Sequence, residues 1–172
     1  MKISILLPYK ENFSPEYAGA VSLFVNDTLK ISKHKKSAIV YGNTNYKKIF
    51  NLNYQNLPIS KMLFQSQSKK YINEFINYEL KRNSDLIELH NRPIYLTYLT
   101  NKLKNKTYIL YFHNDPLTMS GSKSIQERIF LLKNCFKIIF NSNWSKRRFL
   151  EGMKSDYINS EKLVVINQSA KR

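Results

Sequence analysis

Short runs of apolar residues alternate along the chain with longer segments in which apolar residues recur every three or four positions. A short unbroken apolar run predicts a buried strand, and the recurring spacing predicts an amphipathic helix. The runs predict strands at 3–7, 38–41, 86–90, 107–113, 137–141 and 163–166. The spacing predicts helices at 17–32, 66–82 and 143–153, and two more that begin near Pro93 and Ser124. Between 43 and 65 the pattern indicates a loop with one further short strand.

Four of the expected helices carry an apolar face. In chain order the faces comprise Val21, Phe24, Val25 and Leu29; Ile72, Phe75, Ile76 and Leu80; Ile94, Tyr95, Tyr98, Leu99 and Leu103; and Ile125, Ile129 and Leu132. Asn91 is placed to cap the helix near Pro93, and Ser124 with Glu127 has the spacing of a capping box. Because strands and helices alternate with short connections, we expect one α/β domain over 1–172. Its parallel sheet has six to seven strands and helices on both faces.

Length and composition agree with a packed domain, since the chain has 172 residues of which 42% are hydrophobic. The single cysteine, Cys135, cannot form an internal disulfide, and we expect a core thiol at the end of a helix in a reducing compartment. The first apolar run is too short for a signal peptide, and no run approaches the roughly 20 residues of a membrane span. We therefore expect a cytoplasmic protein, with a peripheral position at the inner face of the cell membrane left open.

The chain is strongly basic, with 28 Lys and Arg against 12 Asp and Glu and a net charge of +16. Such a charge favours phosphates, anionic lipid or nucleic acid as partners without choosing among them. The run Lys146-Arg147-Arg148, with Lys30, Lys33, Lys35 and Lys36, is either a solvated face or a contact for phosphates or an anionic membrane surface. No nucleic-acid recognition motif is present, and the aromatic residues fall mostly in strands or on apolar helix faces. We therefore expect no nucleic-acid partner.

Ligands of an open parallel sheet bind beyond the carboxyl ends of its strands, where loops lead into helices. The first such loop begins at Tyr9 and ends at Ala18-Gly19-Ala20. Small residues at the start of a helix let backbone amides approach an anion, although simple close packing would explain Gly19 equally well. A later connection contains Ser142, which with Asn143 is expected to cap the following helix.

Two further strands end in similar blocks, His90-Asn91-Arg92-Pro93 and His113-Asn114-Asp115-Pro116. Proline ends each strand, asparagine can cap the next turn, and histidine is expected to face the crevice. There a histidine can donate to a sugar hydroxyl or a phosphate oxygen, and Arg92 can bind phosphate or carboxylate bidentately. The alternative is that each histidine only satisfies a turn. The 23 residues between the histidines match no compact metal-ligand motif, so no metal is expected at His90, His113 and Asp115.

The order of these features resembles the N-terminal, Rossmann-like domain of family 4 glycosyltransferases from about Met1 to Gln168. The resemblance rests on the small-residue loop at Gly19 and on the strings DLIELHNRP, YILYFHNDP, IIFNSNWSKRRFL and KLVVIN. Transferases acting on lipopolysaccharide or capsule carry similar His-Asn-Arg-Pro and His-Asn-Asp-Pro blocks. The resemblance implies one half of a GT-B enzyme that transfers a sugar, with retention and without a bound metal, from a nucleotide-diphosphate sugar.

The resemblance also implies roles for particular residues. Gly19 and Ala20 would lie near the donor diphosphate, and His113 would lie beside the transferred sugar as the catalytic residue. The residues expected to bind a glycan or glycolipid acceptor are Tyr9, His90, Asn91, Arg92, Asn114, Asp115 and Ser142. The chain has no cofactor of its own, since the nucleotide sugar is a co-substrate held mostly by a donor-binding domain or a second chain.

The sequence departs from the family pattern at two places. Ala18-Gly19-Ala20 stands where family members carry paired glycines, and Asn167 is followed by Gln168 and not by glycine and a second domain. We therefore expect that this chain lacks the donor-binding domain and is inactive alone. Two readings stay open beside a transferase half: a non-enzymatic sugar- or lipid-binding remnant of the fold, and a basic nucleic-acid-binding domain.

Overall fold

A computed structural model of the chain describes residues 1–59, 66–158 and 160–167. The strands are β1 (Ile3–Leu6), β2 (Ala38–Gly42), β3 (Tyr54–Asn56), β4 (Leu86–His90), β5 (Thr107–Phe112), β6 (Lys137–Phe140) and β7 (Leu163–Val165). The helices are α1 (Ala20–Ile31), α2 (Gln67–Arg82), α3 (Ile94–Lys102), α4 (Ile125–Asn134), α5 (Asn143–Leu150) and α6 (Ser155–Ile158), with a 3-10 turn at Pro116–Thr118. The expected alternation of strands and helices is confirmed.

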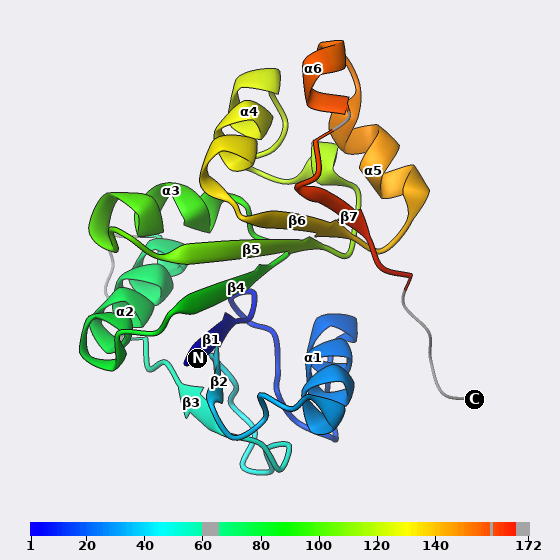
Figure 1. The fold of residues 1–172 in the computed structure, drawn as a ribbon. Coiled ribbons are helices and arrows are strands. Elements are labelled where there is room, and N and C mark those ends of the chain that lie inside the picture. The colour runs from blue at the N-terminus through cyan, green and yellow to red at the C-terminus, as the bar shows by residue number, and fades with distance from the viewer. Residues whose placement is uncertain (60–65, 159, 168–172) are drawn as a thin grey trace.

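The strands form one seven-stranded sheet in the order β3-β2-β1-β4-β5-β6-β7, and neighbouring strands run parallel (Figure 1). The strand order reverses between β1 and β4, because the chain first builds outward to β3 and then returns to the other side of β1. In a parallel sheet this reversal opens a crevice at the carboxyl ends of the strands. The short strand expected between 43 and 65 is β3, and residues 60–65 lie outside the described residues.

Helices pack on both faces of the sheet, as expected, but unequally (Figure 1). One core includes Tyr71 of α2, Leu96 of α3, Leu131 of α4 and Phe149 of α5. The other core is formed by α1, by alternate residues of β1 and β2, and by Phe13 from the first loop. The α1 face therefore covers mainly one half of the sheet, which leaves Glu88 of β4 only half-buried.

The apolar face expected for α2 is wrong at one position. Leu80 is 62% exposed, whereas the preceding residue, Glu79, is fully buried. Glu79 shares a helical face with Ile72, Phe75 and Ile76, and its carboxylate accepts hydrogen bonds from Ser4 Oγ at 2.6 Å and Ser84 N at 2.7 Å. A buried carboxylate is tolerated because these donors replace water.

Two helix boundaries also differ from expectation. Helix α1 begins at Ala20, three residues after the expected start, because Gly19 is extended and its carbonyl accepts from Leu23 N. Helix α5 ends at Leu150, and Gly152 has a left-handed conformation with φ of 74° that separates it from α6. The capping box of Ser124 and Glu127 on α4 is confirmed.

Cys135 ends helix α4 and is buried, as expected for a core thiol. Burial raises the pKa of the thiol to about 12, so its thiolate is disfavoured at neutral pH. No helix in the described part of the chain is both long and apolar enough to cross a lipid bilayer.

Candidate functional site

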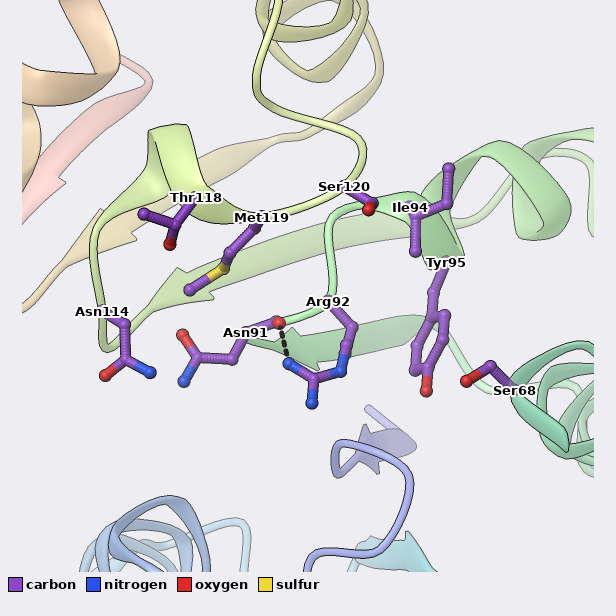
Figure 2. A pocket seen from close by; sticks show the side chains of 9 residues that line it. All are labelled: Ser68, Asn91, Arg92, Ile94, Tyr95, Asn114, Thr118, Met119 and Ser120. Atoms are coloured by element: carbon purple, nitrogen blue, oxygen red, sulfur yellow. Dashed lines mark hydrogen bonds between the residues drawn. The ribbon is translucent and has the colours of Figure 1, made fainter.

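A pocket of about 410 Å³ lies at the carboxyl ends of β4 and β5 (Figure 2). Its lining brings together three residues of the His-Asn-x-Pro blocks, namely Asn91, Arg92 and Asn114. The other lining residues were not predicted from the sequence to lie here: Ser68, Ile94, Tyr95, Thr118, Met119 and Ser120. A pocket of this size matches those that hold small ligands.

Asn91 holds the two strand ends together. Its backbone is left-handed, with φ of 52°, and its Oδ1 accepts from His113 N at 2.7 Å. Asn91 N donates to Tyr111 O at 2.9 Å. The expectation that Asn91 caps α3 is therefore wrong, because its side chain reaches across to β5 while Pro93 occupies the cap position.

Arg92 projects into the pocket beside Tyr95 (Figure 2). Its Nη1 donates to Asn91 O at 2.8 Å, which fixes one edge of the guanidinium. Burial raises the pKa of Tyr95, so this phenol stays protonated, and its oxygen accepts from Tyr9 N at 3.3 Å. Tyr9 thereby ties the first loop to the pocket wall through its backbone, although Tyr9 does not itself line the pocket.

Asn141, at the end of β6, supports His113 from the other side. Its Nδ2 donates to His113 O at 2.7 Å, and its Oδ1 accepts from Ser145 Oγ at 2.8 Å. The backbone of His113 is thus held by two asparagine side chains, one from each neighbouring strand end. Asn141 can be recognised in the sequence as a polar residue directly after a strand. Its hydrogen bond to His113, 28 residues away, cannot be inferred from the sequence.

His90 and His113 are in direct contact. His90 Nδ1 lies 2.9 Å from His113 Nε2, and both rings stack on Tyr111, with ring centroids 4.7 Å and 6.2 Å away. The expectation that both histidines face the crevice is wrong for His90, whose exposed fraction is 1%. Rings of Tyr111 and Phe24 pack against it, so His90 lies behind His113 and does not line the pocket.

The second ring nitrogen of His90 lies near the carboxylate of Glu88. His90 Nε2 is buried, has no hydrogen-bond partner in the described part of the chain, and lies 3.8 Å from Glu88 Oε2. A carboxylate at this distance favours a proton on Nε2. His90 Nδ1 is then an acceptor, and His113 Nε2 donates to it. Glu88, His90 and His113 thus form a series in which each side chain faces the next.

Asp115 points away from the histidines. Its Oδ2 pairs with Arg148 Nη2 at 3.2 Å, and its Oδ1 accepts from Leu117 N at 3.0 Å. The carboxylate therefore caps the 3-10 turn and anchors α5. Within the described residues, no group of three or more His, Cys, Asp and Glu side chains is arranged to hold a metal ion.

Ser142 caps α5, as expected, and its hydroxyl accepts from Ser145 N at 3.1 Å. The basic run that follows is partly neutralised: Arg148 pairs with Asp115 and with Glu151, and Lys146 Nζ donates to Leu163 O at 3.1 Å. Arg147 is exposed.

The start of α1 is already occupied by a carboxylate of the chain itself. Glu11 Oε1 accepts from Ser22 N at 3.0 Å, and a Cβ added to Gly19 would lie 2.3 Å from the same oxygen. Gly19 is needed there because the Glu11 side chain lies against its Cα. Gly19 and Ala20 therefore lie around an internal anion in this structure, and this position of Glu11 was not predicted from the sequence.

Gly121 fixes the loop that carries Thr118, Met119 and Ser120. It has φ of 93°, and a Cβ added to it would lie 2.4 Å from the backbone nitrogen of Ile94. The loop therefore packs directly on the start of α3, and the pocket wall is formed before any ligand binds.

No family model matches the sequence, and no curated protein matches it. The fold matches several solved structures. HepE of Anabaena, in complex with UDP and glucose, is 15% identical with a TM-score of 0.63, over 99% of this chain and 45% of that chain. Sucrose-phosphate synthase from Thermosynechococcus elongatus is 11% identical with a TM-score of 0.65, over 97% of this chain and 48% of that chain. The lipopolysaccharide outer core galactosyltransferase WaaB, in its apo form, is 13% identical with a TM-score of 0.65, over 99% and 46%.

These neighbours are GT-B glycosyltransferases, and the chain spans about half the length of each. The chain therefore has the Rossmann-like fold of one GT-B half, as the resemblance of its motifs implied. At 11–15% identity the likeness establishes the fold, and function has to come from the site.

Proposed function

We propose that the chain is the acceptor-side half of a retaining GT-B glycosyltransferase, which transfers a sugar from a nucleotide-diphosphate sugar to a glycan or glycolipid. The observation that carries the proposal is the pocket at the ends of β4 and β5, lined by Asn91, Arg92 and Asn114 and adjoined by His113. The pocket would hold the acceptor, with its amides and hydroxyls as hydrogen-bond partners for sugar hydroxyls.

His113 would lie at the edge of the acceptor pocket, where the donor sugar has to arrive. Its backbone is held through Asn91 Oδ1 at 2.7 Å and Asn141 Nδ2 at 2.7 Å, which gives the rigid placement that transition-state stabilisation requires. Departure of a nucleoside diphosphate builds negative charge, and groups of a donor-binding domain or second chain would stabilise it. A glycolipid acceptor would place the cytoplasmic chain at the inner face of the membrane.

A non-enzymatic sugar-binding remnant of the fold is the second candidate. It is favoured by Glu11, whose carboxylate already fills the start of α1 and contacts Ser22 N at 3.0 Å. A donor diphosphate near Gly19 would have to displace this carboxylate or suffer its repulsion. Binding of a sugar in the pocket does not require the Glu11 carboxylate to be displaced.

Reconstitution separates the two candidates. The chain would be combined with a separately produced donor-binding domain of a GT-B glycosyltransferase, and release of nucleoside diphosphate from UDP- and GDP-sugars would be measured with glycolipid extracts as acceptors. A transferase half gives release that falls by about 100-fold or more in His113→Ala. Release of nucleoside diphosphate stays unchanged in the control His34→Ala, which alters a histidine in the turn between α1 and β2. Absence of release with every donor would contradict the transferase proposal.

A further inference from the structure

The acceptor pocket contains a positive charge, Arg92, and no carboxylate among the described residues that line it. Within the described residues Arg92 forms no ion pair, and its hydrogen-bond partners in the pocket are neutral: Asn91 O at 2.8 Å and the phenol of Tyr95. Arg148, by contrast, is paired with both Asp115 and Glu151. The guanidinium of Arg92 therefore keeps its affinity for an oxyanion.

Three described carboxylates on the strands and loops around the crevice already have partners. Asp115 faces Arg148 at 3.2 Å, Glu88 lies 3.8 Å from His90 Nε2, and Glu11 accepts from Ser22 N at 3.0 Å. None of them lines the pocket. A negatively charged ligand would thus meet one cation and no like charge among the lining residues.

The rest of the lining fits a sugar that carries the charge. Asn114, Thr118 and Ser120 offer amide and hydroxyl groups, and Ile94 and Met119 offer apolar surface for the C–H face of a sugar ring (Figure 2). Because Gly121 packs on the backbone of Ile94, these groups are held in place before binding. A preformed polar wall opposite an arginine is the arrangement expected for recognition of an anionic sugar.

We propose that the acceptor is an anionic sugar, bearing a phosphate or a carboxylate, and that Arg92 binds this group. The proposal rests on the assignment of this pocket to the acceptor in the proposed function. It adds the chemical class of the substrate, and it makes Arg92 the residue that distinguishes charged from neutral acceptors.

The test is an NMR titration of the isolated chain with glucose 6-phosphate, glucuronic acid and glucose. We expect at least one charged sugar to bind about tenfold or more tightly than glucose, with shifts at Arg92, Asn114 and Thr118. The better of the two charged probes identifies the group as phosphate or carboxylate. Arg92→Gln should bring the charged sugars to within about twofold of glucose, and Arg92→Lys should fall between.

Arg147→Gln is the matched control, because it removes the same charge from an exposed position on α5 outside the pocket. Equal binding of charged and neutral sugars, equal losses in the two arginine variants, or no saturable binding of any probe would each overturn the proposal. The titration involves no donor. If the chain binds charged sugars but supports no transfer after reconstitution, this inference stands and the proposed function is contradicted.

Discussion

His90 Nδ1 and His113 Nε2 are 2.9 Å apart, so one proton joins the two imidazoles. His90 is 1% exposed and lies between His113 and Glu88, whose Oε2 is 3.8 Å from His90 Nε2. The buried histidine is therefore placed to fix the orientation and tautomer of the histidine in front of it. The family resemblance implied that His90 binds the acceptor, and orienting His113 is a different role.

The tautomers are accessible to ¹⁵N NMR of the imidazole rings. We expect His90 to carry its proton on Nε2, facing Glu88, and His113 to donate from Nε2. Glu88→Leu removes the carboxylate and should shift His90 toward the Nδ1-protonated form, whereas Glu88→Gln, which keeps an acceptor oxygen, should shift it less. A proton on Nδ1 of His90 in the unaltered chain would contradict the order Glu88, His90, His113.

Glu11 and Gly19 should act as one unit at the start of α1. Glu11→Ala should lower the free energy of unfolding by about 1 kcal/mol, because a carboxylate cap is lost. Gly19→Ala should cost a similar amount by displacing that carboxylate, since the new Cβ would lie 2.3 Å from Oε1. Chemical denaturation of both single variants and the double variant measures the coupling, which we expect to be about 0.5–1 kcal/mol.

Glu16→Ala serves as the control for that cycle, because Glu16 is an exposed residue of the same loop. Strictly additive costs for Glu11 and Gly19 would show that the carboxylate does not occupy this place in solution.

Gly121 and Gly152 form a matched pair for the pocket wall. Both are left-handed, with φ of 93° and 74°, but an added Cβ meets backbone only at Gly121. We expect Gly121→Ala to lower the free energy of unfolding by roughly 2–5 kcal/mol, from conformational strain and the collision with Ile94 N. Gly152→Ala should cost only about 1–2 kcal/mol, since its Cβ would lie 3.4 Å from Ile125 Cδ1. Thermal or urea unfolding gives both values, and equal costs would mean that the loop does not pack on α3.

Cys135 should resist alkylation in the folded chain. Its pKa is about 12 where an ordinary thiol has 9.0, so its thiolate fraction at pH 8 falls by about a thousandfold. Reaction with a thiol reagent should be slow in the native chain and fast in urea. Because the folded state holds the neutral thiol, its contribution to stability is complete below pH 9 and is lost progressively toward pH 12. Rapid labelling without denaturant would contradict the burial of this side chain.

The sequence predicts the fold well because strand and helix periodicity is a local property. It predicted the alternation, the capping box at Ser124 and the grouping of Asn91, Arg92 and Asn114 at neighbouring strand ends. It could not predict that His90 is buried, because residues 90 and 113 approach each other only through the register of β4 and β5. Glu79 and Glu11 were missed for a similar reason, since their partners lie 75 and 11 residues away in the chain.

We infer that this half of a GT-B fold holds the acceptor and leaves the donor to another domain. Calorimetric titration of the isolated chain with UDP-glucose, UDP-galactose and GDP-mannose measures whether this half binds a donor. We expect dissociation constants no tighter than about 1 mM, because the Glu11 carboxylate already occupies the start of α1, where a donor diphosphate would bind. A dissociation constant of about 1 μM for any of these donors would contradict the claim.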